Sequence, residues 1–196
     1  MRHNYESLGV DEFYKRHGKR YRNPHEIKIN SALKKMLFNK HNEWISEIDF
    51  SFILDLCCGS GEMTLFLKKY LEKHQRETPI RIEGLDPHTH DAYLERTGQK
   101  SHRFDFEDIQ NGILWEILEG EVYSLIVCCY ALHLYEPTRL SSVCYFLSMV
   151  GRHLLIVTPH KRPVIERRLG WILLFESVDQ KVRVRLYESI YLQAHH

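Results

Sequence analysis

Residues 53–62 read Ile-Leu-Asp-Leu-Cys-Cys-Gly-Ser-Gly-Glu, and this stretch decides how the chain folds. Its apolar start predicts a buried strand, and the apolar spacing of residues 63–71 predicts a helix. Two glycines, one residue apart, join these elements, so backbone amides can approach a ligand where no Cβ intervenes. Asp55 lies at the end of the strand, four residues before Gly59. The stretch therefore predicts a ligand-binding crevice at the carboxyl end of a parallel strand.

The spacing of Asp55, Cys57, Gly59 and Gly61 resembles motif I of class I S-adenosylmethionine-dependent methyltransferases, commonly written Asp/Glu-x-Gly-x-Gly-x-Gly. Cys57 stands where that family often has its first glycine. The resemblance implies that S-adenosylmethionine is the cofactor and that this turn packs against its methionine part. It also implies that Asp55 contacts the cofactor's amino group, often through water. The nicotinamide fingerprint Gly-x-Gly-x-x-Gly fits poorly, because no third glycine follows Gly61 at that spacing.

Two later acids stand where the resemblance implies further cofactor contacts. Asp86 ends a short apolar strand and precedes Pro87, and it is expected to accept hydrogen bonds from the ribose hydroxyls. Asp105 follows a third strand and is expected to bind the adenine amino group, with Phe106 beside the ring. The alternatives are that Asp86 is a turn residue and that the acids after Phe106 only cap the next helix.

Residues 123–133 read Tyr-Ser-Leu-Ile-Val-Cys-Cys-Tyr-Ala-Leu-His and resemble motif IV of the same family, although Ser124 stands where the family usually has Asp. The continuous apolar run predicts a central parallel strand. The resemblance implies that the end of this strand faces the methyl sulfonium, so Cys129, Tyr130 and His133 are expected near the chemistry.

Three further strands are predicted at residues 153–158, 171–178 and 182–191. The strands and helices predict an α/β fold. The resemblance implies that it is a doubly wound, seven-stranded, mostly parallel sheet with an antiparallel C-terminal strand, and that N-terminal helices cap the cofactor site. We expect a single methyltransferase domain over residues 1–196. In it, residues 1–49 form a helical and basic segment, and residues 50–191 form a Rossmann-like core.

The expected reaction is an in-line methyl transfer from an already activated sulfonium. The protein has to hold the acceptor in line with the departing sulfur and to accept a proton where needed. His133 and His160, which follow the fourth and fifth strands, are the candidate bases, and Tyr130 is expected to orient the acceptor. The alternative for each of these residues is a structural role.

Residues 13–28 carry six Lys or Arg against one acid, interleaved with three aromatic residues. This composition is typical of a surface that binds a phosphate backbone and stacks bases, so the predicted acceptor is RNA. The alternative is a solvated face whose aromatic residues pack on the core. The resemblance implies that this segment covers the pocket, and its candidate substrate contacts are Tyr14, His17, Tyr21, Arg22 and His25. Asn23 and Glu26 are expected to form a capping box at the start of the following helix.

Other acceptors stay open. The residues after the fourth strand lack the Asn/Asp-Pro-Pro-Tyr sequence of methyltransferases that act on amino groups of bases, and the cysteines lack a Pro-Cys context. A small molecule or a protein is the alternative acceptor, and a non-catalytic partner or scaffold domain is a further alternative.

Composition narrows the remaining possibilities. No apolar stretch approaches the ~18 residues of a membrane span, and the N-terminus lacks the apolar block of a secretory signal. Five cysteines without Cys-x-x-Cys spacing predict neither a disulfide framework nor a zinc site, and we expect no bound metal. A cytoplasmic or nuclear protein is expected, and the sequence does not indicate its oligomeric state.

Overall fold

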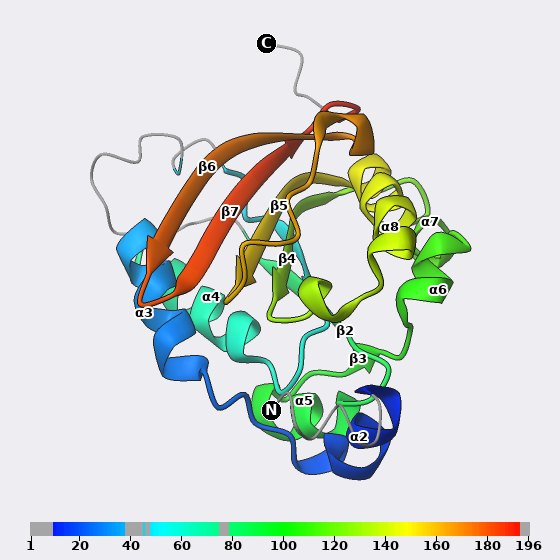
Figure 1. The fold of residues 1–196 in the computed structure, drawn as a ribbon. Helices are drawn as coiled ribbons and strands as arrows, with labels where there is room; N and C mark the ends of the chain where they lie inside the picture. Colours follow the sequence, from blue (N-terminus) through cyan, green and yellow to red (C-terminus); the bar gives the residue numbers. More distant parts are fainter. Residues whose placement is uncertain (1–9, 38–44, 46–47, 75–78, 193–196) are drawn as a thin grey trace.

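The computed structural model describes residues 10–37, 45, 48–74 and 79–192, and these residues are built around one seven-stranded sheet (Figure 1). The strand order is β3-β2-β1-β4-β5-β7-β6. β7 pairs antiparallel with both of its neighbours, β5 and β6, and the other neighbouring strands pair in parallel. The predicted fold class is therefore confirmed. The strands are β1 Phe52–Leu56, β2 Arg81–Leu85, β3 Ser101–His102, β4 Tyr123–Cys129, β5 Gly151–Thr158, β6 Trp171–Asp179 and β7 Val182–Ser189.

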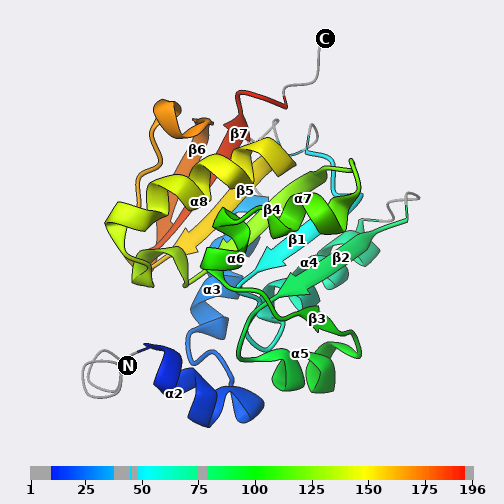
Figure 2. The same ribbon diagram turned by 90° about the vertical axis from the view of Figure 1, so that its right-hand side faces the viewer.

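Helices cover both faces of the sheet, as Figures 1 and 2 show from two directions. Helices α3 (Glu26–Leu37) and α4 (Glu62–Lys73) pack on one face, and α6 (Phe106–Gln110), α7 (Ile113–Leu118) and α8 (Pro137–Val150) pack on the other. Helices α2 (Val10–His17) and α5 (His90–Thr97) lie together at the bottom of Figure 1. Short 3₁₀ turns occur at Gly18–Arg20 (η1), Leu132–Leu134 (η3) and Arg167–Leu169 (η4).

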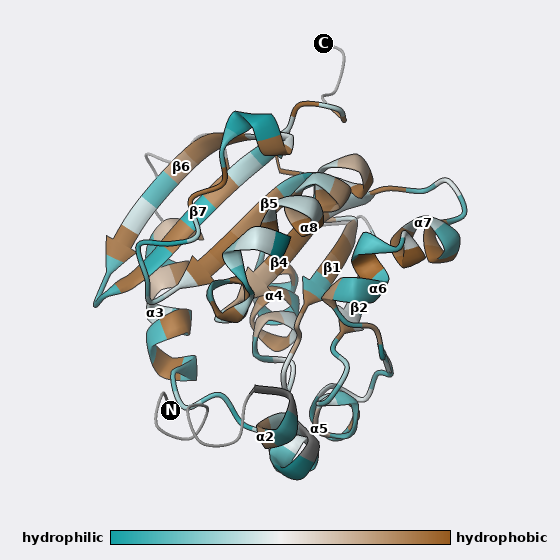
Figure 3. Cartoon of the chain, turned by 45° about the vertical axis from the view of Figure 1, so that its right-hand side comes forward, coloured by the Kyte–Doolittle hydropathy of each residue, from teal (hydrophilic) through white to brown (hydrophobic). Residues whose placement is uncertain are grey.

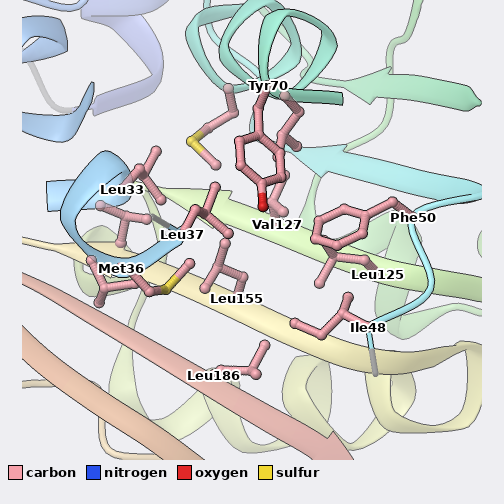
Figure 4. Close-up of a cluster of buried hydrophobic side chains, with 14 of the residues drawn as sticks. Leu33, Met36, Leu37, Ile48, Phe50, Tyr70, Leu125, Val127, Leu155 and Leu186 are labelled. Atoms are coloured by element: carbon pink, nitrogen blue, oxygen red, sulfur yellow. The ribbon is translucent and has the colours of Figure 1, made fainter. Parts of the chain in front are cut away.

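Each face of the sheet has its own hydrophobic core. On one face, Leu33, Met36 and Leu37 of α3 are buried and face Leu155 and Leu186 of the sheet (Figure 4). Strand β1 is buried along its whole length. Most residues of β4 and β5 are buried as well. Because these strands are covered on both faces, they are largely hydrophobic in Figure 3 and do not alternate in polarity.

The two halves of the sheet diverge between β1 and β4. Leu56 of β1 pairs with Cys128 of β4, yet the chain leaves β1 toward β2 and leaves β4 toward β5. Doubly wound sheets bind ligands outside the carboxyl ends of the strands at such a switch point. The predicted motif I turn follows β1 at this position.

The structure gives Ser124 a structural role and corrects the prediction for the start of α3. Ser124, which replaces the expected Asp, ties β4 to β1, because its hydroxyl donates to the Phe52 carbonyl (2.8 Å) and accepts from the Phe52 amide (3.0 Å). The prediction of a capping box at the start of α3 is wrong. The Asn23 side chain accepts from the His25 amide (2.9 Å), but the Asn23 amide donates to Glu62 (2.9 Å) instead of Glu26. A tertiary partner has displaced the local one.

Within the residues that the structure describes, no helix is long and apolar enough to cross a membrane. The first nine residues, on which the prediction of no secretory signal rests, lie outside that part of the chain.

Candidate functional site

The turn after β1 adopts an unusual backbone conformation. Cys57, Gly59 and Gly61 all have positive φ, at 56°, 55° and 86°. Glycine adopts this region without steric cost, whereas a residue with a Cβ pays about 1–2 kcal/mol. The alternating glycines of motif I are therefore explained by geometry, and Cys57 holds the same conformation with some strain.

Asp55 is buried directly beneath this turn. One of its carboxylate oxygens accepts from the Thr64 amide (3.0 Å) and hydroxyl (2.7 Å), and Tyr93 contacts the same hydroxyl (3.0 Å). Burial raises the pKa of Asp55 to about 8, against the hydrogen bonds from Thr64 that lower it. Asp55 also lines a small cavity of about 20 Å³ together with Cys57, Gly59 and other residues.

This raised pKa predicts a pH-dependent stability. Folded Asp55 keeps a proton that the unfolded chain loses above its ordinary pKa of 3.8, so the free energy of unfolding falls as pH rises from about 4 to about 8. Between about pH 6 and pH 7.5 the loss should be about 2 kcal/mol. Urea unfolding of Asp55→Asn should show a flatter pH profile than wild type. Asp49→Asn, at an exposed site, is the control; equal slopes for Asp55→Asn and wild type would contradict the assignment.

Asp86 holds the loop after β2 against the motif I turn. One carboxylate oxygen accepts from the amides of His88 and Thr89, both at 2.9 Å, and the other accepts from the Gly59 amide at 3.3 Å. Asp55 pairs with Gly84 in the sheet, two residues before Asp86. Both acids therefore lie at the same edge of the sheet, and Asp86 contacts the turn directly.

A pocket of about 450 Å³ opens at this edge, and we call it the first pocket. It collects most of the residues predicted to bind the cofactor: Cys57, Gly59, Asp86, Pro87, Asp105, Phe106 and Cys129. Four carboxylates line it (Asp86, Asp105, Glu107 and Glu136) against one arginine, Arg139. Gly61 lies outside it and is the N-cap of α4.

Asp105 has a second role in the structure. It is the N-cap of α6, where its side chain accepts from the amides of Glu107 (2.7 Å) and Asp108 (3.0 Å). In turn, the Asp108 carboxylate accepts from the Asp105 amide (2.9 Å). The alternative that the acids after Phe106 cap this helix is borne out for Asp108, which forms the capping box together with Asp105. Phe106 packs on Tyr135 with ring centroids 4.5 Å apart, so an aromatic surface lines this end of the pocket.

A second pocket of about 690 Å³ adjoins the first. The two share Tyr14, Tyr21, Tyr130 and Leu134. The remaining residues that line the second pocket are Asn23, His25, His133, Pro159, His160, Lys161 and Arg162. All three candidate catalytic residues are thus brought together here.

Tyr130 lies between the two pockets in a strained conformation. Its φ is 59°, and its amide donates to the Val157 carbonyl (2.8 Å). The ring stacks on His25 with centroids 5.2 Å apart, and its pKa is raised to about 12, mainly by burial. Non-glycine residues with positive φ cluster at functional sites. Tyr130 is therefore held as a neutral phenol that borders both pockets.

The N-terminal segment, residues 10–26, is fastened across the first pocket. Buried Glu62 accepts from the Asn23 amide and pairs with Arg96 (3.2 Å), which also pairs with Glu26. A Cβ on Gly59 would lie 3.0 Å from the Tyr21 ring, so this glycine allows the segment to approach. The expectation that this segment covers the pocket agrees with the described contacts.

The candidate substrate residues divide into two groups. Tyr14, Tyr21 and His25 line the pockets, whereas exposed His17 and Arg22 do not, and Arg22 instead pairs with Glu95 (3.6 Å). The position of His17 and Arg22 gives no support to a substrate contact. Sequence reasoning missed several lining residues that no local motif marks: Phe104, Tyr135, Arg139, Lys161 and Arg162.

Among the residues that the structure describes, the cysteines and histidines are not grouped as metal ligands, and the thiols of Cys57 and Cys129 have raised pKa values. No group of three possible ligands is arranged for a metal among residues 10–37, 45, 48–74 and 79–192. Cys57 lies within hydrogen-bonding range of Cys128, and this contact and burial raise its pKa; burial also raises the pKa of Cys129. Thiols with raised pKa values are poor nucleophiles.

Solved structures that this fold resembles include methyltransferases. Magnesium protoporphyrin IX methyltransferase from Synechocystis PCC 6803, crystallised with S-adenosylmethionine, superposes with a TM-score of 0.55 over 96% of this chain and 94% of that chain, at 15% identity. An O-methyltransferase family protein from Burkholderia thailandensis gives a TM-score of 0.59 over 98% of this chain and 63% of that chain, at 14% identity. At these identities the likeness establishes the fold.

A closer relative is known from sequence. The uncharacterised protein C17A5.05c of Schizosaccharomyces pombe is 34% identical over 197 aligned residues, which cover 87% of this chain and 79% of that protein. No family model matches the chain. The chain therefore belongs to the family of this Schizosaccharomyces pombe protein, within the class I S-adenosylmethionine-dependent methyltransferase fold.

Proposed function

We propose that this protein is an S-adenosylmethionine-dependent methyltransferase whose residues 1–196 act as one domain. The observation that carries the proposal is the first pocket, in which the left-handed turn after β1, Asp86 and an aromatic surface meet at the switch point of the sheet. The Synechocystis neighbour of the same fold binds S-adenosylmethionine. The four carboxylates of the pocket also suit a cofactor that carries a positive sulfonium and several hydrogen-bond donors.

Each part of the pocket has a proposed partner on the cofactor. Asp86 would accept from a ribose hydroxyl through Oδ2, which accepts only the Gly59 amide, whereas Oδ1 already accepts the amides of His88 and Thr89. Asp105 and Phe106 would hold the adenine. Asp55, beneath the turn of Cys57, would face the methionine end.

When bound, the cofactor supplies an electrophilic methyl group. The chain's own residues would then hold the acceptor in the second pocket, beside Tyr130. His133 and His160, whose rings lie 4.6 Å apart, would take a proton from the acceptor where it carries one. Tyr130 would orient the acceptor through its phenol.

The first acceptor class to test is RNA, because the basic N-terminal segment borders both pockets through Tyr14, Tyr21 and His25. A small molecule or protein is the second class. It is favoured by ion pairs that offset the charge of this segment: Arg16 with Glu12 (2.7 Å), Lys19 with Asp91 (3.9 Å) and Arg22 with Glu95 (3.6 Å). A cytoplasmic or nuclear location is proposed, because all five cysteines are free thiols.

The function is tested by incubating the protein with methyl-labelled S-adenosylmethionine and fractionated cell extract. Label in a nuclease-sensitive fraction would support RNA, and label in a small-molecule or protease-sensitive fraction would support the second class. The absence of label in every fraction, with the cofactor bound, would favour the alternative of a non-catalytic partner domain.

The RNA proposal makes a separate prediction about charge. Changing Lys15, Arg16, Lys19 and Arg20 to alanine should weaken RNA binding by about tenfold or more at moderate salt, because each lost phosphate contact reduces counterion release. Filter binding at several salt concentrations measures both the affinity and its salt slope. An unchanged affinity and slope would remove RNA as the acceptor.

A further inference from the structure

We propose that the second pocket is an anion site that binds a phosphate or carboxylate group of the methyl acceptor. This inference rests on the proposed function, in which that pocket holds the acceptor. It names the acceptor's chemistry, which neither the fold nor the comparisons specify.

The charges that line the two pockets differ sharply. The second pocket has three histidines, a lysine and an arginine on its wall, and none of the described residues that line it is Asp or Glu. Two carboxylates next to residues of this pocket, Glu26 and Glu62, pair with Arg96. The first pocket carries four carboxylates. A cationic cofactor in one pocket and an anionic acceptor in the other would each meet complementary charge.

The lysine and the arginine of the second pocket also lack a carboxylate partner among the described residues. Neither Lys161 nor Arg162 forms an ion pair with another described residue, and both are exposed. Three arginine or lysine residues of the N-terminal segment, in contrast, do have carboxylate partners. Ammonium and guanidinium groups without internal partners are available for charge-assisted hydrogen bonds to an external anion.

A buried arginine shapes the loop that carries these cations. Arg185 of β7 donates to the carbonyls of Lys161 and Pro163, both at 2.6 Å, and its side chain is only 3% exposed. Its Nε lies 3.4 Å from Glu176 of β6. The backbone of the loop after β5 is therefore held by a side chain of the sheet, so the positions from which Lys161 and Arg162 extend are fixed before an anion binds, which lowers the cost of binding.

The imidazoles converge on the same space from three separate segments. His25 precedes α3, His133 lies in η3, and His160 follows β5. His133 and His160 are 4.6 Å apart, and Tyr130 contacts both His25 and His133. An anion between these rings could accept hydrogen bonds from several donors at once.

The test uses inorganic phosphate and then acetate as probes. Each is titrated into the full chain at constant ionic strength, with the imidazole signals followed by NMR. We expect saturable shifts for His25, His133 and His160, and no shift for His17, which lies outside both pockets. Shifts with phosphate alone assign a phosphate-bearing acceptor, and shifts with both probes extend the class to carboxylates. No saturable shift with either probe would overturn the proposal.

Matched charge variants separate a site from general attraction. A double variant, Lys161→Ala and Arg162→Ala, should bind phosphate about tenfold or more weakly, because two charge-assisted contacts are lost. Arg167→Ala with Arg168→Ala removes the same charge from exposed η4 positions outside the pocket and should leave the affinity within about twofold. Equal loss in both pairs would overturn the proposal.

Calorimetry with S-adenosylmethionine on the same samples distinguishes a failure of the anion site from a failure of the methyltransferase proposal. Cofactor binding without phosphate binding would overturn the anion site and leave the methyltransferase proposal in place. Phosphate binding without cofactor binding would overturn the methyltransferase proposal, while the anion site would stand.

Discussion

Asp86→Ala is expected to weaken S-adenosylmethionine binding by about a hundredfold, because the change removes two or more charge-assisted hydrogen bonds to the ligand and its loop. Asp86 lines the first pocket and also accepts from the amides of Gly59, His88 and Thr89. Its loss should therefore remove the ribose contact and loosen the turn next to it. Isothermal calorimetry measures the affinity.

Asp86→Asn provides the graded control. It keeps one acceptor oxygen and the shape of the side chain, so we expect a smaller loss of about tenfold. Far-ultraviolet circular dichroism should show that both variants are folded. A folded Asp86→Ala protein that binds the cofactor as tightly as wild type would place the cofactor elsewhere.

Gly61→Ala is expected to lower the free energy of unfolding by about 3 kcal/mol, from backbone strain and overpacking together. Gly61 has φ 86°, and an added Cβ would lie 2.3 Å from Thr97 Cγ2 and 3.3 Å from the Tyr93 ring. Thr97 cannot move easily, because its hydroxyl donates to the Tyr93 carbonyl (2.8 Å). Urea denaturation measures the change.

Gly98→Ala separates the two contributions. Gly98 has φ 72°, but an added Cβ would meet no atom within 4 Å, so only the conformational cost of about 1 kcal/mol is expected. If both variants lost the same stability, the close packing of α5 against the motif I turn would not contribute.

The fold was predictable because its signals are local in sequence. The strand, turn and helix around Gly59 lie within residues 52–73, and the buried strands read as continuous apolar runs. Asp86 was predictable for the same reason, since it directly follows a strand. The positive φ at Cys57 shows that the motif specifies a backbone conformation, which a small side chain can also adopt at some cost.

The acceptor side was less predictable because tertiary contacts assemble it. Glu62, thirty-nine residues away, takes the Asn23 amide that a capping box would have given to Glu26. Lys161 and Arg162 are unremarkable in sequence, and Arg185 of another strand sets their loop. His25 reaches the second pocket, whereas His17, one helix earlier, does not. The composition of the segment could not predict which of these two histidines lines the pocket.

Co-crystallisation with S-adenosylhomocysteine tests the central claim most directly. The account predicts that the ligand lies in the first pocket, with its ribose on Asp86, its adenine beside Phe106 and its sulfur facing Tyr130. An empty first pocket at saturating ligand, or a ligand bound at another surface, would contradict it.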